Sequence, residues 1–156
     1  MRSYILIILR FLFLLLITNI IGGMAASYMT PETLQWYHTL PLSPYNPPRW
    51  IFVAIWPILF TMMSFSMALV WGKISPWPFI CFLGFTGLWS FLFFYMRSPL
   101  GGLVGLIGFL GFGLMHLRAL KRRSSLAFYL FLPTLLWGIF ALYLNAYILF
   151  KISSVV

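Results

Sequence analysis

The side chains of this chain that could take part in chemistry are aromatic rings rather than acids, bases or metal ligands. Glu32 is the only carboxylate side chain, so the sequence has no pair of carboxylates for general acid–base work. No histidine and cysteine cluster has metal-ligand spacing, and no glycine-rich phosphate loop is present. Tryptophan faces stack on conjugated rings, and Arg49 could pair with a ligand carboxylate. These residues favour a pocket for a flat, apolar molecule.

The most distinctive aromatic residues lie in 45–63, where a proline-rich loop leads into an apolar helix. Pro47 and Pro48 fix their own φ and suit the first helical turn, whose N–H groups need no partner. Trp50 and Trp56 are six residues apart. At this spacing the two rings point about 120° apart around a helix, so one cannot stack on the other. We expect them to form a wide aromatic wall at the mouth of a membrane helix.

The composition indicates a membrane protein. The chain is 63% hydrophobic and only 7% charged, whereas soluble domains carry about 25% charged residues. The net charge of +9 raises the question whether the chain binds nucleic acid. However, the basic residues lie between apolar runs rather than in one stripe, so membrane topology explains them and we expect no nucleic-acid partner.

The apolar runs predict an all-α integral membrane bundle, with residues 1–156 as a single domain. In the first run a cleaved signal peptide is the alternative, since Arg2 precedes an apolar stretch and 23–26 resembles a cleavage site. Against it, this run reaches the length of about 20 residues that spans a bilayer. We expect a long loop at 28–46 and five transmembrane helices at about 4–27, 48–72, 77–96, 100–117 and 126–150.

Positive charge predicts the orientation of the helices. If the N-terminus is inside, the inside segments hold seven basic residues: Arg2, Arg10, Lys73, Arg118, Lys121, Arg122 and Arg123. The outside segments then hold three: Arg49, Arg97 and Lys151. This bias predicts a cytoplasmic N-terminus, with the 28–46 loop and the C-terminus outside.

Several polar or small residues have two interpretations. Thr30 and Pro31 predict a short helix start in the long loop. Trp36 and Tyr37 follow this start, and one interpretation of the pair is an interfacial aromatic belt. Asn145 lies deep in the last helix and must be paired. It either locks helices together, which we favour, or meets a ligand.

The fourth predicted helix carries two further features. Gly101, Gly105 and Gly108 form a small-residue face for close packing within the chain or for a dimer, and we favour packing within the chain. His116 lies near the basic end of this helix. We expect it to be an interfacial polar residue rather than a haem ligand, because no second histidine lies at ligand spacing from it.

Three motifs resemble the TspO/MBR family of tryptophan-rich sensory and translocator proteins. The first is Pro47–Pro48 with Trp50, Trp56, Leu59, Phe60 and Met63, where Phe60 replaces the usual Tyr and Ser64 the usual Gly. In the second, 86–94, Thr86 stands where the family has Asn, which removes an amide that can donate and accept. The third, 133–145, matches the family pattern closely around Trp137, Ala141 and Asn145. The Trp36–Tyr37 pair also resembles the Trp-Tyr of the family's first loop, which folds over the mouth of the bundle, so the resemblance implies a lid over a pocket as the alternative to an interfacial belt.

The resemblance implies a receptor or regulatory protein that binds porphyrins such as protoporphyrin IX and haem as ligands, with no required cofactor. A transporter of tetrapyrroles or sterols is the alternative, and a porphyrin-degrading photo-oxidative enzyme is a second one, although no classical catalytic residue is visible. The implied ligand site consists of Trp36, Trp50, Trp56, Phe60, Thr86, Trp89, Phe93, Trp137, Ala141, Leu144 and Asn145.

The expected partners are a hydrophobic small molecule, membrane lipid and a second copy of the chain in a homodimer. Leu144, Tyr147 and Lys151 also fit the spacing of a proposed cholesterol motif. The expected location is a bacterial inner membrane.

Overall fold

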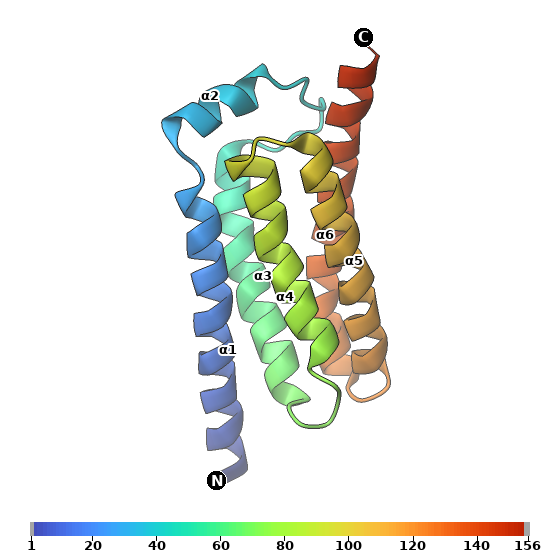
Figure 1. Cartoon of the computed structure of the whole chain (residues 1–156). Helices are drawn as coiled ribbons and strands as arrows, with labels where there is room; N and C mark the ends of the chain where they lie inside the picture. The colour runs from blue at the N-terminus through green and yellow to red at the C-terminus, as the bar shows by residue number, and fades with distance from the viewer. Residues whose placement is uncertain (1, 155–156) are drawn as a thin grey trace.

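Five long helices stand side by side in the computed structural model, which describes residues 2–154, and a short sixth helix crosses one end of them (Figure 1). The short helix is α2 (Pro31–Thr39). The long ones are α1 (Arg2–Ser27), α3 (Arg49–Leu69), α4 (Trp77–Ser90) with the π-helical turn η1 (Phe91–Tyr95), α5 (Pro99–Lys121) and α6 (Ser125–Ser153). All five have the length and hydropathy of a membrane span. The predicted all-α, five-span architecture is therefore confirmed.

Side-chain caps explain where several of these helices begin. The backbone N–H of Thr33 donates to the Thr30 hydroxyl at 3.2 Å, and Pro31 occupies the first turn of α2. This confirms the helix start predicted inside the 28–46 segment, so that segment is partly helical rather than a plain loop. Ser98 and Ser124 cap α5 and α6 in the same way. Each cap satisfies an N–H group that has no partner within its helix.

The five long helices form a closed ring. Contacts run from α1 to α3, from α3 to α6, from α6 to α5 and from α5 to α4, and a lighter contact between α4 and α1 completes the circle. The interior is apolar, and Met63, Phe82 and Phe131 are fully buried in it. The ring thus places α3, α4 and α6, which carry the three motifs, around one interior.

The glycine face of α5 packs within the chain. A Cβ atom added at Gly105 would lie 2.8 Å from the Cα of Trp89, and one at Gly101 would lie 3.1 Å from the Cβ of Leu92. A Cβ atom added at Gly108 would lie even closer to the Phe85 ring. The favoured alternative, close packing within the chain, is confirmed for these glycines, because side chains there would hold α4 and α5 apart.

The structure corrects the expectation for His116, which is not an interfacial residue. Its ring is fully buried, 5.0 Å from the Phe79 ring and 4.8 Å from the Phe131 ring, measured between centroids. The sequence position near the basic end was misleading because this face of α5 turns toward α4 and α6 rather than toward the surface.

Candidate functional site

A continuous path of aromatic rings leads from α2 into the bundle. The Trp36 ring contacts Phe93 at 5.5 Å between centroids, and Phe93 stacks on Trp89 at 6.3 Å. Trp89 in turn lies 6.2 Å from Trp56, which lies 5.4 Å from Phe60. We call these five rings the aromatic path. The structure therefore brings together five predicted site residues from four different elements.

Local structure positions the middle of this path. The turn η1 widens the end of α4, and π-helical turns of this kind often mark functional sites. Within η1 the Phe93 ring is buried, with 4% of its surface exposed. The close approach of Gly105 to the Trp89 backbone fixes the neighbouring turn of α4. Phe93 and Trp89 are thus held by backbone geometry as well as by ring contacts.

Two polar groups beside the aromatic path are buried without a hydrogen-bond partner among residues 2–154. They are the indole N–H of Trp89 and the side-chain amide of Asn145, which is 3% exposed. Gly102 lies close to the amide and to Phe93, since a Cβ atom added there would lie 2.9 Å from Asn145 Nδ2 and 2.6 Å from the Phe93 ring. The expected hydrogen bond that locks helices through Asn145 is therefore not formed. A buried polar group left unpaired costs about 1–3 kcal/mol.

Thr86 uses its hydroxyl within its own helix. The hydroxyl donates to the Phe82 carbonyl at 2.9 Å, and the side chain is buried. An oxygen that already donates can still accept a second hydrogen bond. While this bond is kept, Thr86 can offer a ligand an acceptor but no donor, unlike the Asn that the family resemblance implies at this position.

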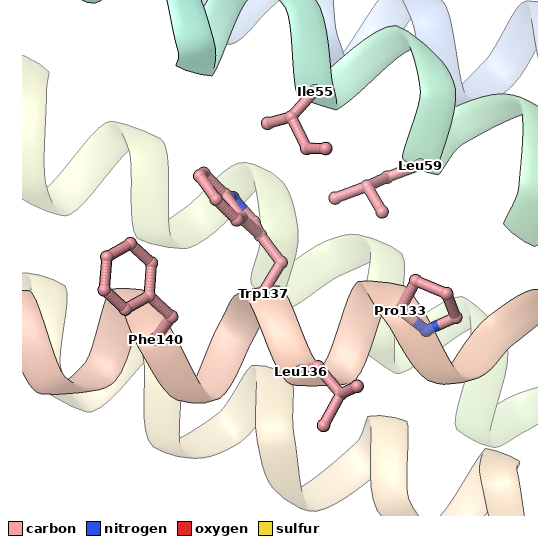
Figure 2. A pocket seen from close by; sticks show the side chains of 6 residues that line it. All are labelled: Ile55, Leu59, Pro133, Leu136, Trp137 and Phe140. Atoms are coloured by element: carbon pink, nitrogen blue, oxygen red, sulfur yellow. The ribbon is translucent and has the colours of Figure 1, made fainter. Parts of the chain in front are cut away.

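Trp137 lies apart from the aromatic path. It lines a groove of about 310 Å³ between α3 and α6, together with Ile55, Leu59, Pro133, Leu136 and Phe140 (Figure 2). Leu136 at the edge of this groove is 56% exposed, so the groove opens toward the outer surface of the bundle. The Trp137 ring also contacts Phe52 on α3 at 5.5 Å.

The remaining predicted residues divide between the interior and the surface. Ala141 and Leu144 are buried on α6, one turn or less from Asn145. Trp50 is 68% exposed in the first turn of α3. The aromatic wall expected from Trp50 and Trp56 is thus split, with one ring turned outward and the other in the aromatic path.

Helix α2 lies across the end of the bundle as a lid (Figure 1). The rings of Trp36 and Tyr37 both contact Phe93, which favours the lid over the interfacial belt. The Tyr37 phenol donates to Asn46 Oδ1 at 3.0 Å. Burial raises the pKa of Tyr37, and the bond to Asn46 opposes this shift.

A tether between Ser43 and Tyr143 connects the lid segment to α6, with 3.0 Å between the two hydroxyl oxygens. Sequence reasoning missed this contact. The two residues are 100 positions apart, and neither stands out by composition, so no local signal could have paired them.

The charge of Glu32 should make the lid sensitive to pH. The nearby Thr30 hydroxyl and the backbone N–H of Glu32 lower the pKa of this carboxyl group, and Arg97 adds to the effect. Because the pKa of Glu32 is lower in the folded protein than in the unfolded one, its carboxylate stabilises α2 at pH values above the unfolded pKa. This stabilisation is lost as the pH falls through the folded pKa. We expect hydrogen exchange in α2, corrected for its intrinsic pH dependence, to accelerate over that range. A Glu32→Gln variant with the same acceleration would contradict this role.

Comparisons with known proteins agree with the motifs. The TspO/MBR family model matches residues 13–151. A tryptophan-rich protein TspO of Chlorobaculum tepidum is 38% identical over 136 residues, which cover 81% of this chain and 86% of that protein. One of Archaeoglobus fulgidus is 31% identical over 131 residues, covering 79% and 84%. The translocator protein of Ovis aries is 30% identical over 133 residues, covering 80% and 79%.

Proposed function

Because this chain belongs to the TspO/MBR family, we propose that it binds a planar hydrophobic ligand, such as a porphyrin, inside its helix bundle beneath α2. The aromatic path supplies the stacking surface. The indole N–H of Trp89 and the amide of Asn145 supply polar contacts for the edge of the ligand. The protein acts in this proposal as a receptor that holds the ligand.

The observation that carries this proposal is the pair of unpaired polar groups beside the aromatic path. A bundle that only had to be stable would gain by replacing Asn145 with an apolar residue, since a buried amide without a partner lowers stability. A ligand with carboxylates at its rim, such as protoporphyrin, would accept a hydrogen bond from the amide N–H and offer ring faces to Trp89 and Phe93. Such apolar sites with a few polar groups are typical of small-molecule pockets.

Entry of the ligand requires movement of the lid. In the structure the Trp36 ring rests on Phe93, and the rings of the aromatic path contact one another. Helix α2 is held mainly through its side chains rather than by close helix–helix packing. Displacing Trp36 from Phe93 would therefore open the path without unfolding the bundle.

We also propose that the lid faces the outside of the cell. Arg2 and Arg10 belong to the N-terminal half of α1, and Lys73 to the turn between α3 and α4. The N-terminus of α1 and this turn lie at the same end of the bundle as the basic turn between α5 and α6 (Figure 1). Cytoplasmic segments carry the excess of Lys and Arg in membrane proteins. This end would then be cytoplasmic in a bacterial inner membrane.

Protoporphyrin IX titration of the purified protein tests the proposed function. We expect saturable quenching of tryptophan fluorescence, and Trp36→Ala should weaken the apparent affinity about tenfold, which corresponds to the roughly 1.4 kcal/mol of one lost ring contact. The midpoint of the titration is the quantity to compare, because removing a tryptophan also lowers the total signal.

The matched control is Trp77→Ala. Trp77 is 68% exposed at the start of α4, at the end of the bundle away from the lid. This variant should keep the wild-type midpoint. Equal midpoints for Trp36→Ala and the wild-type protein would contradict binding beneath α2, and an absence of saturable quenching would contradict porphyrin binding altogether.

A further inference from the structure

A second groove, of about 400 Å³, runs along the seam between α1 and α4, from the turn after α3 toward the middle of the bundle. We propose that this groove holds one acyl chain of an anionic phospholipid, with the lipid phosphate bound by Arg10. We call it the seam groove. The residues that line it include Phe13, Leu14, Met67, Trp71, Leu83 and Gly84. It is separate from the ligand site beneath α2, so the two proposals can fail independently.

The seam groove has the shape and chemistry that suit a hydrocarbon chain. Its floor consists of nearly buried apolar side chains, with Leu14 at 5% and Met67 at 4% exposure, whereas Phe13 at the rim is 54% exposed. A Cβ atom added at Gly84 would meet no atom within 4 Å, so this glycine leaves space. Surfaces that face an empty gap lose dispersion contacts. A flexible lipid chain would restore them, and the contact between α1 and α4 is light enough to admit it.

Arg10 stands at one end of this groove. Its guanidinium carbon lies 5.8 Å from the centroid of the Trp71 ring, and the Phe13 ring packs against the same tryptophan at 6.2 Å. Trp71 follows the last turn of α3, which ends at Leu69. Arg10 is therefore level with the end of a membrane span, where lipid headgroups lie, and tryptophan is common at that depth. The planar fork of an arginine matches a phosphate with two parallel hydrogen bonds.

The charges around the seam groove favour an anion. Glu32, the only acidic side chain of the chain, lies in α2 at the other end of the bundle. No carboxylate side chain can therefore neutralise Arg10. Lys73 adds a second cation in the turn after α3, where its ammonium group donates to the Leu69 carbonyl at 3.3 Å. Basic pockets between helices are known to bind anionic headgroups, so the groove should prefer anionic over zwitterionic lipid.

Native mass spectrometry of the detergent-solubilised protein tests this selectivity. Phosphatidylglycerol and phosphatidylcholine with identical chains are added in competition. We expect the wild-type protein to retain phosphatidylglycerol at least about fivefold better than phosphatidylcholine. Arg10→Gln should lower this ratio about fivefold. Arg118→Gln makes the same change in charge at the end of α5 and should leave the preference unchanged. Arg10→Lys, which keeps the charge but loses the fork, should retain part of it.

The groove itself is tested by filling it. Gly84→Leu places a side chain in open space and should reduce retention of both lipids, whereas Gly111→Leu, which also meets no atom within 4 Å but lies on α5, should not. Three results would overturn the proposal: equal retention of the two lipids by the wild-type protein, an equal loss in Arg118→Gln, or unchanged retention in Gly84→Leu. If the wild-type spectrum shows a species with the mass of two chains, and this species is absent for Gly84→Leu, the occupant of the groove is a second copy of the chain.

Discussion

Gly105→Leu is expected to destabilise the bundle by about 3 kcal/mol, at the upper end of what overpacking usually costs. A Cβ atom at this position would lie 2.8 Å from Trp89 Cα and 3.2 Å from Trp89 N. These are backbone atoms, which cannot rotate away as a side chain can. The substitution must therefore push α5 away from α4, at the turn of α4 that carries Trp89.

Thermal unfolding in detergent, followed by circular dichroism, measures this effect. The control is Gly111→Leu on the same helix, because a Cβ atom there meets no atom within 4 Å. Both variants replace one glycine of α5 with the same side chain, so differences in helix propensity cancel. Equal midpoints for the two variants would show that α4 and α5 do not pack as closely as the structure places them.

Asn145→Leu is expected to raise the stability of the ligand-free protein by about 1–3 kcal/mol and to weaken porphyrin binding. The first effect follows because the amide of Asn145 is buried without a hydrogen-bond partner among the described residues 2–154, and a leucine of similar shape has no polar group to desolvate. The second follows because the proposed contact with the ligand rim is lost. If Asn145 had only a structural role, its replacement would not raise stability and weaken porphyrin binding at the same time.

Thr134→Val is the matched control for this trade-off. Within the described part of the chain, the Thr134 hydroxyl is also fully buried without a hydrogen-bond partner. Thr134 precedes Asn145 by eleven residues on α6, which is roughly 16 Å along the helix, so it lies outside the proposed ligand site. Its replacement should stabilise the protein and leave the protoporphyrin titration unchanged. If Asn145→Leu lowers stability, the amide is hydrogen-bonded in the folded protein. If it leaves porphyrin affinity unchanged, Asn145 is not part of the ligand site.

The structure brings together only some of the site residues that the sequence predicted. Trp36, Trp56 and Trp89 were proposed as site residues from separate motifs, and their rings belong to one path. Trp50 and Trp137 were proposed on the same grounds, yet they lie on the surface and in the α3–α6 groove. Spacing along one helix gives the angle between two residues, but it does not say which neighbour each of them faces.

The sequence by itself determined that this protein is a five-span helical membrane protein of the TspO/MBR type, and where its helices and the start of α2 lie. The spans and the start of α2 follow from hydropathy, length and caps, which depend on residues close together in the chain, whereas the family type follows from the sequence motifs. Only the tertiary structure decided the order of helices in the ring, the inward turn of His116, the unpaired amide of Asn145 and the tether from Ser43 to Tyr143. These depend on how each helix is rotated against its neighbours, and packing between residues far apart in the chain sets that rotation.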